Sequence, residues 1–208
     1  MQSLRARTIG TDLMFYYLKY QQIEEVSQML QRREVLVNDQ DVNGKTALHV
    51  ACEVNVLSLV KLLLSHGANP NIPTHLDIGY FIPLHKACEK GNKEIVELLL
   101  KAGSDINARN KVGQTALHIS IRQRNVELSK FLISAGANVD VRDTAGCNAS
   151  YYAKTNGLKE ISEILPQAVT MKPEEAMDYH VFVRAVLGFD PSSVGKKKKG
   201  KKGKKGKK

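Results

Sequence analysis

A short motif recurs along the chain at a nearly constant interval, and this repetition constrains the fold more than any other feature. The motif is TALHVAC at residue 46, IPLHKAC at 82, TALHISI at 115 and NASYYAK at 148, which gives offsets of 36, 33 and 33 residues. A period of this length indicates a repeat architecture, in which each unit buries its apolar face only against its neighbours.

Each motif is followed by a second apolar stretch, such as LSLVKLLLSHGANPN or EIVELLLKAGSDIN. The leucines recur at helical spacing, so each unit is predicted to be a pair of helices with the second largely buried. Gly91 and Gly157 fall at the end of the first helix, where a left-handed residue lets the chain turn back. Asn55 holds the same slot in the first repeat, and Arg124, in the third, predicts a strained or altered turn.

The pattern resembles the ankyrin repeat family, whose units of about 33 residues open with T-P-L-H-x-A. The resemblance covers about residues 12–166 and implies an all-α solenoid of helix-turn-helix units with β-hairpin fingers. Residues 1–11 then form an N-terminal segment. The implied units are a degenerate N-terminal cap at 12–40, repeats at 41–81, 82–110 and 111–143, and a C-terminal cap at 144–166.

Histidine followed three residues later by cysteine occurs twice, which is close to the spacing of zinc ligands. The repeat offers a different interpretation. The histidine slot is filled in three repeats, by His49, His85 and His118. The family resemblance implies that these histidines are structural and hydrogen-bond the neighbouring threonine and backbone. Cys52 and Cys88 hold a buried slot that is Ile121 in the third repeat, so we expect neither a metal nor a cofactor.

Catalytic signatures are not apparent in the sequence. It contains no G-x-S-x-G, no H-E-x-x-H and no Walker loop in a strand-to-helix context. The carboxylate pairs Glu24–Glu25 and Glu174–Glu175 are interpreted as solvated charge on polar helix faces. We therefore expect no enzymatic activity.

The charge of the chain is concentrated in its last residues. The net charge is +10, from 31 Lys and Arg against 21 Asp and Glu. Taking away ten C-terminal lysines leaves 21 basic residues, so the rest of the chain is neutral. These lysines are Lys196, Lys197, Lys198, Lys199, Lys201, Lys202, Lys204, Lys205, Lys207 and Lys208. Lysine and glycine cannot build a core, so the polybasic tail, residues 192–208, is predicted to be disordered.

Several classes of binding partner are compatible with the polybasic tail. Its charge suits nucleic acid, anionic lipid, the acidic tails of tubulin or a nuclear-import receptor. It contains no arginine and no aromatic residue, so any nucleic-acid contact would be weak and blind to sequence. A purely solubilising role is the alternative.

The family resemblance also implies where a protein partner would bind, because ankyrin proteins use finger tips and first helices. The corresponding slots are Val42, Asn43, Lys45, Glu53, Val54, Lys111, Val112, Gln114, Arg122 and Gln123, with Arg109 and Arg142 at the finger bases. We expect these side chains to be exposed.

The second finger is longer than the others. Asn71 lies eleven residues before the next motif, whereas the same step elsewhere takes eight. The enlarged finger carries four large apolar side chains, Leu76, Ile78, Tyr80 and Phe81. They are interpreted either as an interaction hot spot or as a cover folded over neighbouring repeats.

Residues 167–191 include a predicted helix at about 173–187, which either caps the solenoid or binds a partner. Three cysteines at no framework spacing fit a reducing, intracellular compartment, either cytoplasm or nucleus. No apolar run is long enough to span a membrane, and the N-terminus does not resemble a signal peptide. We expect a monomer.

These features predict a non-enzymatic interaction module that holds a protein partner on its repeats, with the polybasic tail as an accessory. The alternative is a factor associated with nucleic acid or another anionic surface, in which the tail is the main binder. The two hypotheses differ in how steeply binding falls with salt.

Overall fold

The computed structural model describes residues 2–165, which fall within one compact unit of the chain, Met1–Ala168. The inner helices are α1 (Gln2–Lys19), α3 (Ala47–Val54), α5 (Pro83–Lys90), α7 (Ala116–Arg122) and α9 (Ala149–Thr155). The outer helices are α2 (Ile23–Gln31), α4 (Leu57–Ser65), α6 (Lys93–Lys101), α8 (Val126–Ser134) and α10 (Lys159–Ile164). The predicted helix at 173–187 and the polybasic tail lie outside the described residues.

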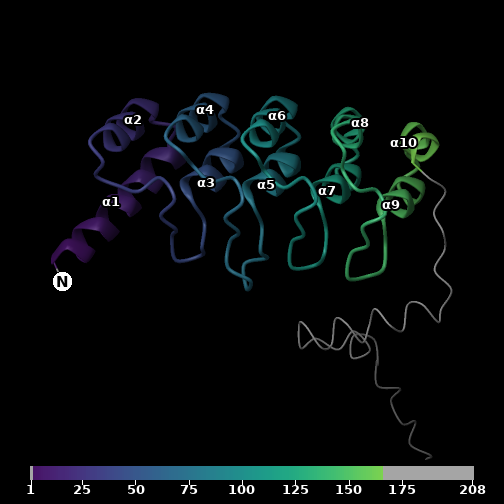
Figure 1. Ribbon diagram of the computed structural model, residues 1–208, viewed down its shortest axis with the longest axis horizontal. Helices are drawn as coiled ribbons and strands as arrows, with labels where there is room; N and C mark the ends of the chain where they lie inside the picture. The colour runs from purple at the N-terminus through teal and green to yellow at the C-terminus, as the bar shows by residue number, and fades with distance from the viewer. Residues whose placement is uncertain (1, 166–208) are drawn as a thin grey trace, which may run out of the picture. The chain divides into compact units, whose positions relative to one another are not determined.

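The helices form two rows, with long loops descending from the inner row (Figure 1). Each inner helix contacts the next, from α1 through α3, α5 and α7 to α9. In the outer row α2 contacts α4, α4 contacts α6, and α8 contacts α10. The prediction of an all-α repeat solenoid is therefore confirmed. Within residues 2–165, no helix is both long and apolar enough to cross a membrane.

The leucines of the repeated motif fill the space between the two rows. Leu48, Leu84 and Leu117 hold the same slot on successive inner helices and are fully buried. The outer helices supply Leu63, Leu99 and Leu132 at 0% exposure, again one for each unit. One contiguous core thus runs through the stack, as expected when each unit is stabilised mainly by its neighbours.

The turn between inner and outer helix needs a left-handed residue, as the sequence predicted. Gly91 and Gly157 have φ of 74° and 69°, and Asn55 has φ of 60°. Arg124 takes the same conformation with φ of 58°, which confirms the strained turn in the third repeat. A side chain in this region costs about 1–2 kcal/mol relative to glycine.

The fingers differ from the prediction of β-hairpins. Residues 2–165 contain no β-strand, only an isolated bridge between Gln40 and Thr46. The first finger closes instead on the side chain of Asp41, whose Oδ1 accepts the backbone N–H groups of Asn43 and Lys45 at 2.8 Å. Because that carboxylate takes N–H groups that a ladder would use, the first finger is a tight turn rather than a pair of strands.

Candidate partner-binding surface

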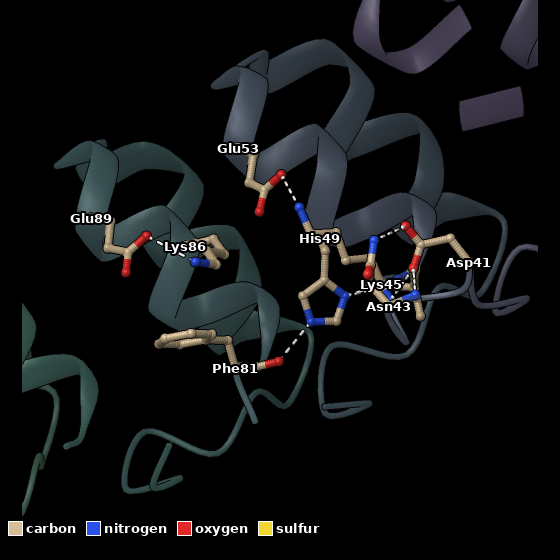
Figure 2. Close-up of polar contacts among 9 residues, drawn as sticks. Asp41, Asn43, Lys45, His49, Glu53, Phe81, Lys86 and Glu89 are labelled. Carbon is tan, nitrogen blue, oxygen red and sulfur yellow. Dashed lines mark hydrogen bonds and ion pairs between the residues drawn. The ribbon is translucent and has the colours of Figure 1, made fainter. Parts of the chain in front are cut away.

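The repeated histidine links each unit to the next. His49 Nδ1 lies 3.0 Å from the backbone nitrogen and 2.9 Å from Oγ1 of Thr46, at the start of α3. Its Nε2 lies 2.8 Å from the carbonyl oxygen of Phe81, in the second finger (Figure 2). His85 reaches the Ala108 carbonyl at 3.0 Å, and His118 the carbonyl of Cys147 at 3.2 Å. One histidine therefore fixes its own helix start and the following finger together.

The partners of these histidines define their proton positions. A backbone N–H can only donate, so Nδ1 of His49 accepts and Nε2 carries the proton that it donates to Phe81. Burial lowers the pKa of His49 and of His85 to about 4, and it also lowers the pKa of His118. The rings are therefore neutral near pH 7, with both nitrogens of each ring engaged within the protein.

The cysteines that follow two of these histidines are also enclosed. Cys52 and Cys88 are completely buried, and burial raises the pKa of both thiols, which keeps them protonated. In the part of the chain that the structure describes, no three His, Cys, Asp or Glu side chains are placed to share a metal ion. A buried thiol of this kind behaves as a small apolar side chain.

The fingers are joined to one another through their backbones. The N–H of His75 in the second finger donates to the Asn43 carbonyl in the first, at 3.0 Å. The second and third fingers are joined from Lys111 to Gly79 at 2.8 Å. A similar bond of 2.9 Å joins the fourth finger to Val112 of the third. The finger tips are thus held side by side rather than as independent loops.

Five large apolar side chains are exposed on these joined tips. They come from the first three fingers and are Val42, Leu76, Ile78, Tyr80 and Val112. We call these five residues the tip row. Val42 is 92% exposed, which is the greatest exposure among the large apolar side chains of residues 10–165. A set of apolar side chains on a rigid support is typical of an interaction surface.

The structure separates the two aromatic residues of the long second finger. Phe81 folds onto α5, where its ring lies edge-on to His85 and 3.9 Å from Nζ of Lys86. Tyr80 has a left-handed φ of 55° and projects into solvent. Phe81 therefore covers the neighbouring helix, whereas Tyr80 stays available to a partner.

Polar pairs line the inner helices beside the fingers. Lys45 Nζ lies 2.9 Å from Glu53 on α3, and Lys86 Nζ lies 3.1 Å from Glu89 on α5 (Figure 2). In the third repeat the guanidinium of Arg122 donates to the side chain of Gln114 at 3.1 Å. The expectation that Gln114 is exposed is wrong, because it is only 7% exposed.

The remaining predicted contact residues divide into two kinds. Arg109 and Arg142 serve the finger bases, because Arg109 donates to the Arg142 carbonyl at 2.7 Å and Arg142 donates to that of Gly146 at 3.3 Å. The others are available at the surface to different extents: Lys111, Arg122 and Gln123 are exposed, and Asn43 and Val54 are half-buried.

Comparison with known proteins gives two matches to family models. An ankyrin repeat model matches residues 43–75, and a model of three ankyrin repeats matches residues 84–172. The chain belongs to the ankyrin repeat family. The ankyrin matches together span more than half of the chain, and ankyrin repeats are in general protein–protein interaction modules, typically without enzymatic activity. A search of curated proteins found no match.

The ankyrin array also carries an exposed apolar stripe that the sequence analysis missed. It lies on α1, ahead of the residues matched by the ankyrin models, and consists of Leu13, Tyr16 and Tyr20. The stripe could have been found from its helical spacing, because the opposite face of α1 has the same spacing in Thr11, Met14 and Leu18, which are buried.

Proposed function

We propose that this chain is a non-enzymatic adaptor whose ankyrin array binds a protein partner through the tip row and the adjoining inner helices. The observation that carries the proposal is the tip row itself, in which apolar side chains stay exposed on fingers joined by backbone hydrogen bonds. In this proposal the polybasic tail is an accessory that adds affinity or location inside the cell.

The binding free energy expected from the tip row is sufficient for a specific protein contact. Covering an exposed Val, Leu or Ile side chain contributes on the order of 1–2 kcal/mol, and Tyr80 adds an aromatic anchor. Because neighbouring fingers are bonded to one another, little backbone freedom is lost on binding. The ion pairs Lys45–Glu53 and Lys86–Glu89 form a polar rim, which favours a partner with complementary charge.

A capture experiment tests this proposal. The full chain and the double variant Leu76→Ser/Tyr80→Ser are used to capture partners from lysate at moderate salt, with mass spectrometry as the readout. The matched control is Ile164→Ser, because Ile164 is 52% exposed and Leu76 51%. Loss of the same proteins with the double variant but not with the control supports the proposal. Retention of all of them by the double variant, with unchanged thermal stability, contradicts it.

The second candidate function makes the polybasic tail the main binder of nucleic acid or another anionic surface. It rests on ten lysines within the last fourteen residues. Truncation after Gly195 would then remove binding altogether, and binding to the full chain would fall steeply with salt. Contacts made through the tip row would survive the truncation and depend weakly on salt.

A further inference from the structure

The exposed stripe on α1 lies at one end of the array, with no described element beyond it (Figure 1). Tyr16 is 53% exposed and Tyr20 58% exposed, and Leu13 precedes them by one turn. The two tyrosines are already ordered, with ring centroids 4.6 Å apart. Rigid aromatic side chains of this kind are favoured anchors in protein interfaces.

The C-terminal unit shows what the position equivalent to Tyr16 can contact. The left-handed residue after each inner helix aligns Gln21, with φ of 58°, with Gly157, with φ of 69°. Tyr16 and Tyr152 each lie five residues before this point and so hold the same slot. Tyr152 packs edge-on against His118 of the preceding unit, at 5.9 Å between ring centroids. The slot of Tyr16 thus faces the place where a preceding unit would lie.

The slot of Tyr20 lies at the edge of the same face. Its equivalent is Asn156, which also lies one residue before the left-handed position. Asn156 Nδ2 donates to the carbonyl of Ile121 in the preceding unit, at 3.3 Å. Lys90 and Gln123 hold the same slot in internal repeats and stay exposed although a preceding unit is present. The stripe on α1 is therefore an exposed apolar surface in which Tyr16, rather than Tyr20, faces the place of a preceding unit.

The charges beside the stripe match those of a second copy. Asp12 and Lys19 are both exposed, are seven residues apart, and lie on the same flank of the stripe. In an antiparallel pair of α1 helices with a two-fold axis near Tyr16, Asp12 of each copy lies beside Lys19 of the other.

We propose that two copies of this chain pair through their α1 helices, antiparallel, with Leu13, Tyr16 and Tyr20 at the centre and Asp12 opposite Lys19 at each end. Each exposed side chain offers on the order of 100 Å², so the interface lies below about 1,000 Å² in total. The dimer is therefore weak, with a dissociation constant on the order of 10–100 µM.

The dimer is tested by sedimentation velocity of the full chain. A concentration range of about 5 to 500 µM brackets the expected dissociation constant. We expect reversible dimerisation, and we expect Tyr16→Arg/Tyr20→Arg to remain monomeric with a normal melting temperature. The control is Tyr151→Arg, which alters an exposed tyrosine at the other end of the array and should dimerise normally. A chain that stays monomeric throughout the range, or a control that loses dimerisation equally, overturns the proposal.

Charge reversal tests the antiparallel arrangement and does not depend on the tyrosines. Asp12→Lys and Lys19→Asp should each weaken dimerisation several-fold at low salt, because each places like charges together across the two-fold axis. The double variant Asp12→Lys/Lys19→Asp should restore it. A double variant that dimerises no better than the single variants contradicts the antiparallel pairing. Partner capture by the tip row is unaffected by either result.

Discussion

The two end units of the ankyrin array differ in the polarity of their exposed faces. At the C-terminal end Lys154 is exposed in a slot that holds buried Cys52, Cys88 and Ile121 in the earlier repeats. At the N-terminal end the corresponding outward face of α1 keeps Tyr16 and its apolar neighbours. Polar terminal faces keep a repeat array soluble, and Lys154 gives its unit a polar side chain in this slot, whereas α1 keeps exposed apolar side chains.

This difference shows that a degenerate repeat is not always a cap. Both ends have lost the Leu-His pair of the motif, which gives the same impression from sequence. The outcome depends on which face lost its apolar residues. The predictions that follow move residues between internal and terminal slots, or compare the internal histidines with the terminal unit.

The largest effect on stability is expected when the lysine of the C-terminal unit is placed in the equivalent slot of an internal repeat. Ile121→Lys introduces a charge where the side chain is 0% exposed, and should lower the free energy of unfolding by about 3–5 kcal/mol. Urea unfolding followed by circular dichroism measures this. Ile121→Cys, which restores the residue of the other repeats, should cost only about 1–2 kcal/mol. If Ile121→Lys lowers the free energy of unfolding less than Ile121→Cys does, then polarity in this slot does not distinguish the C-terminal unit from the internal repeats.

The second effect is a pH dependence that belongs to the internal repeats. The pKa of His49 and His85 is about 4 in the folded chain, against 6.5 for an unperturbed histidine. Between these values the unfolded chain binds protons that the folded chain does not, so stability falls as pH drops from about 6.5 to about 4. Each of these histidines contributes on the order of 3 kcal/mol to this loss.

Urea unfolding at intervals from pH 7 to pH 4.5 measures the effect. His49→Gln should give a shallower slope of stability against pH, whatever its stability at pH 7. Tyr151→Phe, at the equivalent slot of the terminal unit, should leave the slope unchanged. Equal slopes for the chain and for His49→Gln would show that this histidine is not protonated on unfolding.

A smaller effect is expected at the turn between inner and outer helix. The C-terminal unit has Gly157 there, but the third repeat has Arg124 with φ of 58°. Arg124→Gly should raise the free energy of unfolding by about 1 kcal/mol, because it removes a side chain from the left-handed region. The control Arg122→Gly, inside α7, should lower it. A loss of stability with Arg124→Gly would mean that the arginine side chain stabilises its own turn.

The smallest effect on stability should come from giving the C-terminal end an apolar face. Lys154→Ile alters an exposed side chain and should change the free energy of unfolding by less than about 0.5 kcal/mol. It should nevertheless increase self-association in sedimentation experiments. Lys61→Ile, on the exposed surface of α4, is the control and should not. Unchanged self-association of Lys154→Ile would show that the polar side chain in this slot does not prevent self-association at the C-terminal unit.

The helices and their turns could be predicted because the repeat itself fixes their register. The motif spacing located the left-handed slots of Asn55, Gly91 and Gly157 without any knowledge of tertiary contacts. The same register placed Arg124 in a strained turn. Local signals of this kind suffice when each unit repeats the environment of the last.

The finger surface was less predictable because it depends on contacts between units. The burial of Gln114 follows from the way the third finger lies against Arg122 on α7. The separation of Phe81 from Tyr80 follows from a left-handed backbone at Tyr80. Neither feature has a signature in residue spacing, whereas the α1 stripe did have one and was missed.

The histidine bonds also have a direction that matters while the chain is being made. Each runs from one unit to a carbonyl later in the sequence, 32 residues on for His49, 23 for His85 and 29 for His118. At about 5–20 residues per second, a ribosome supplies each missing carbonyl roughly 1–6 seconds after its histidine. Each of these histidine bonds can therefore form only after the finger of the next unit has been made.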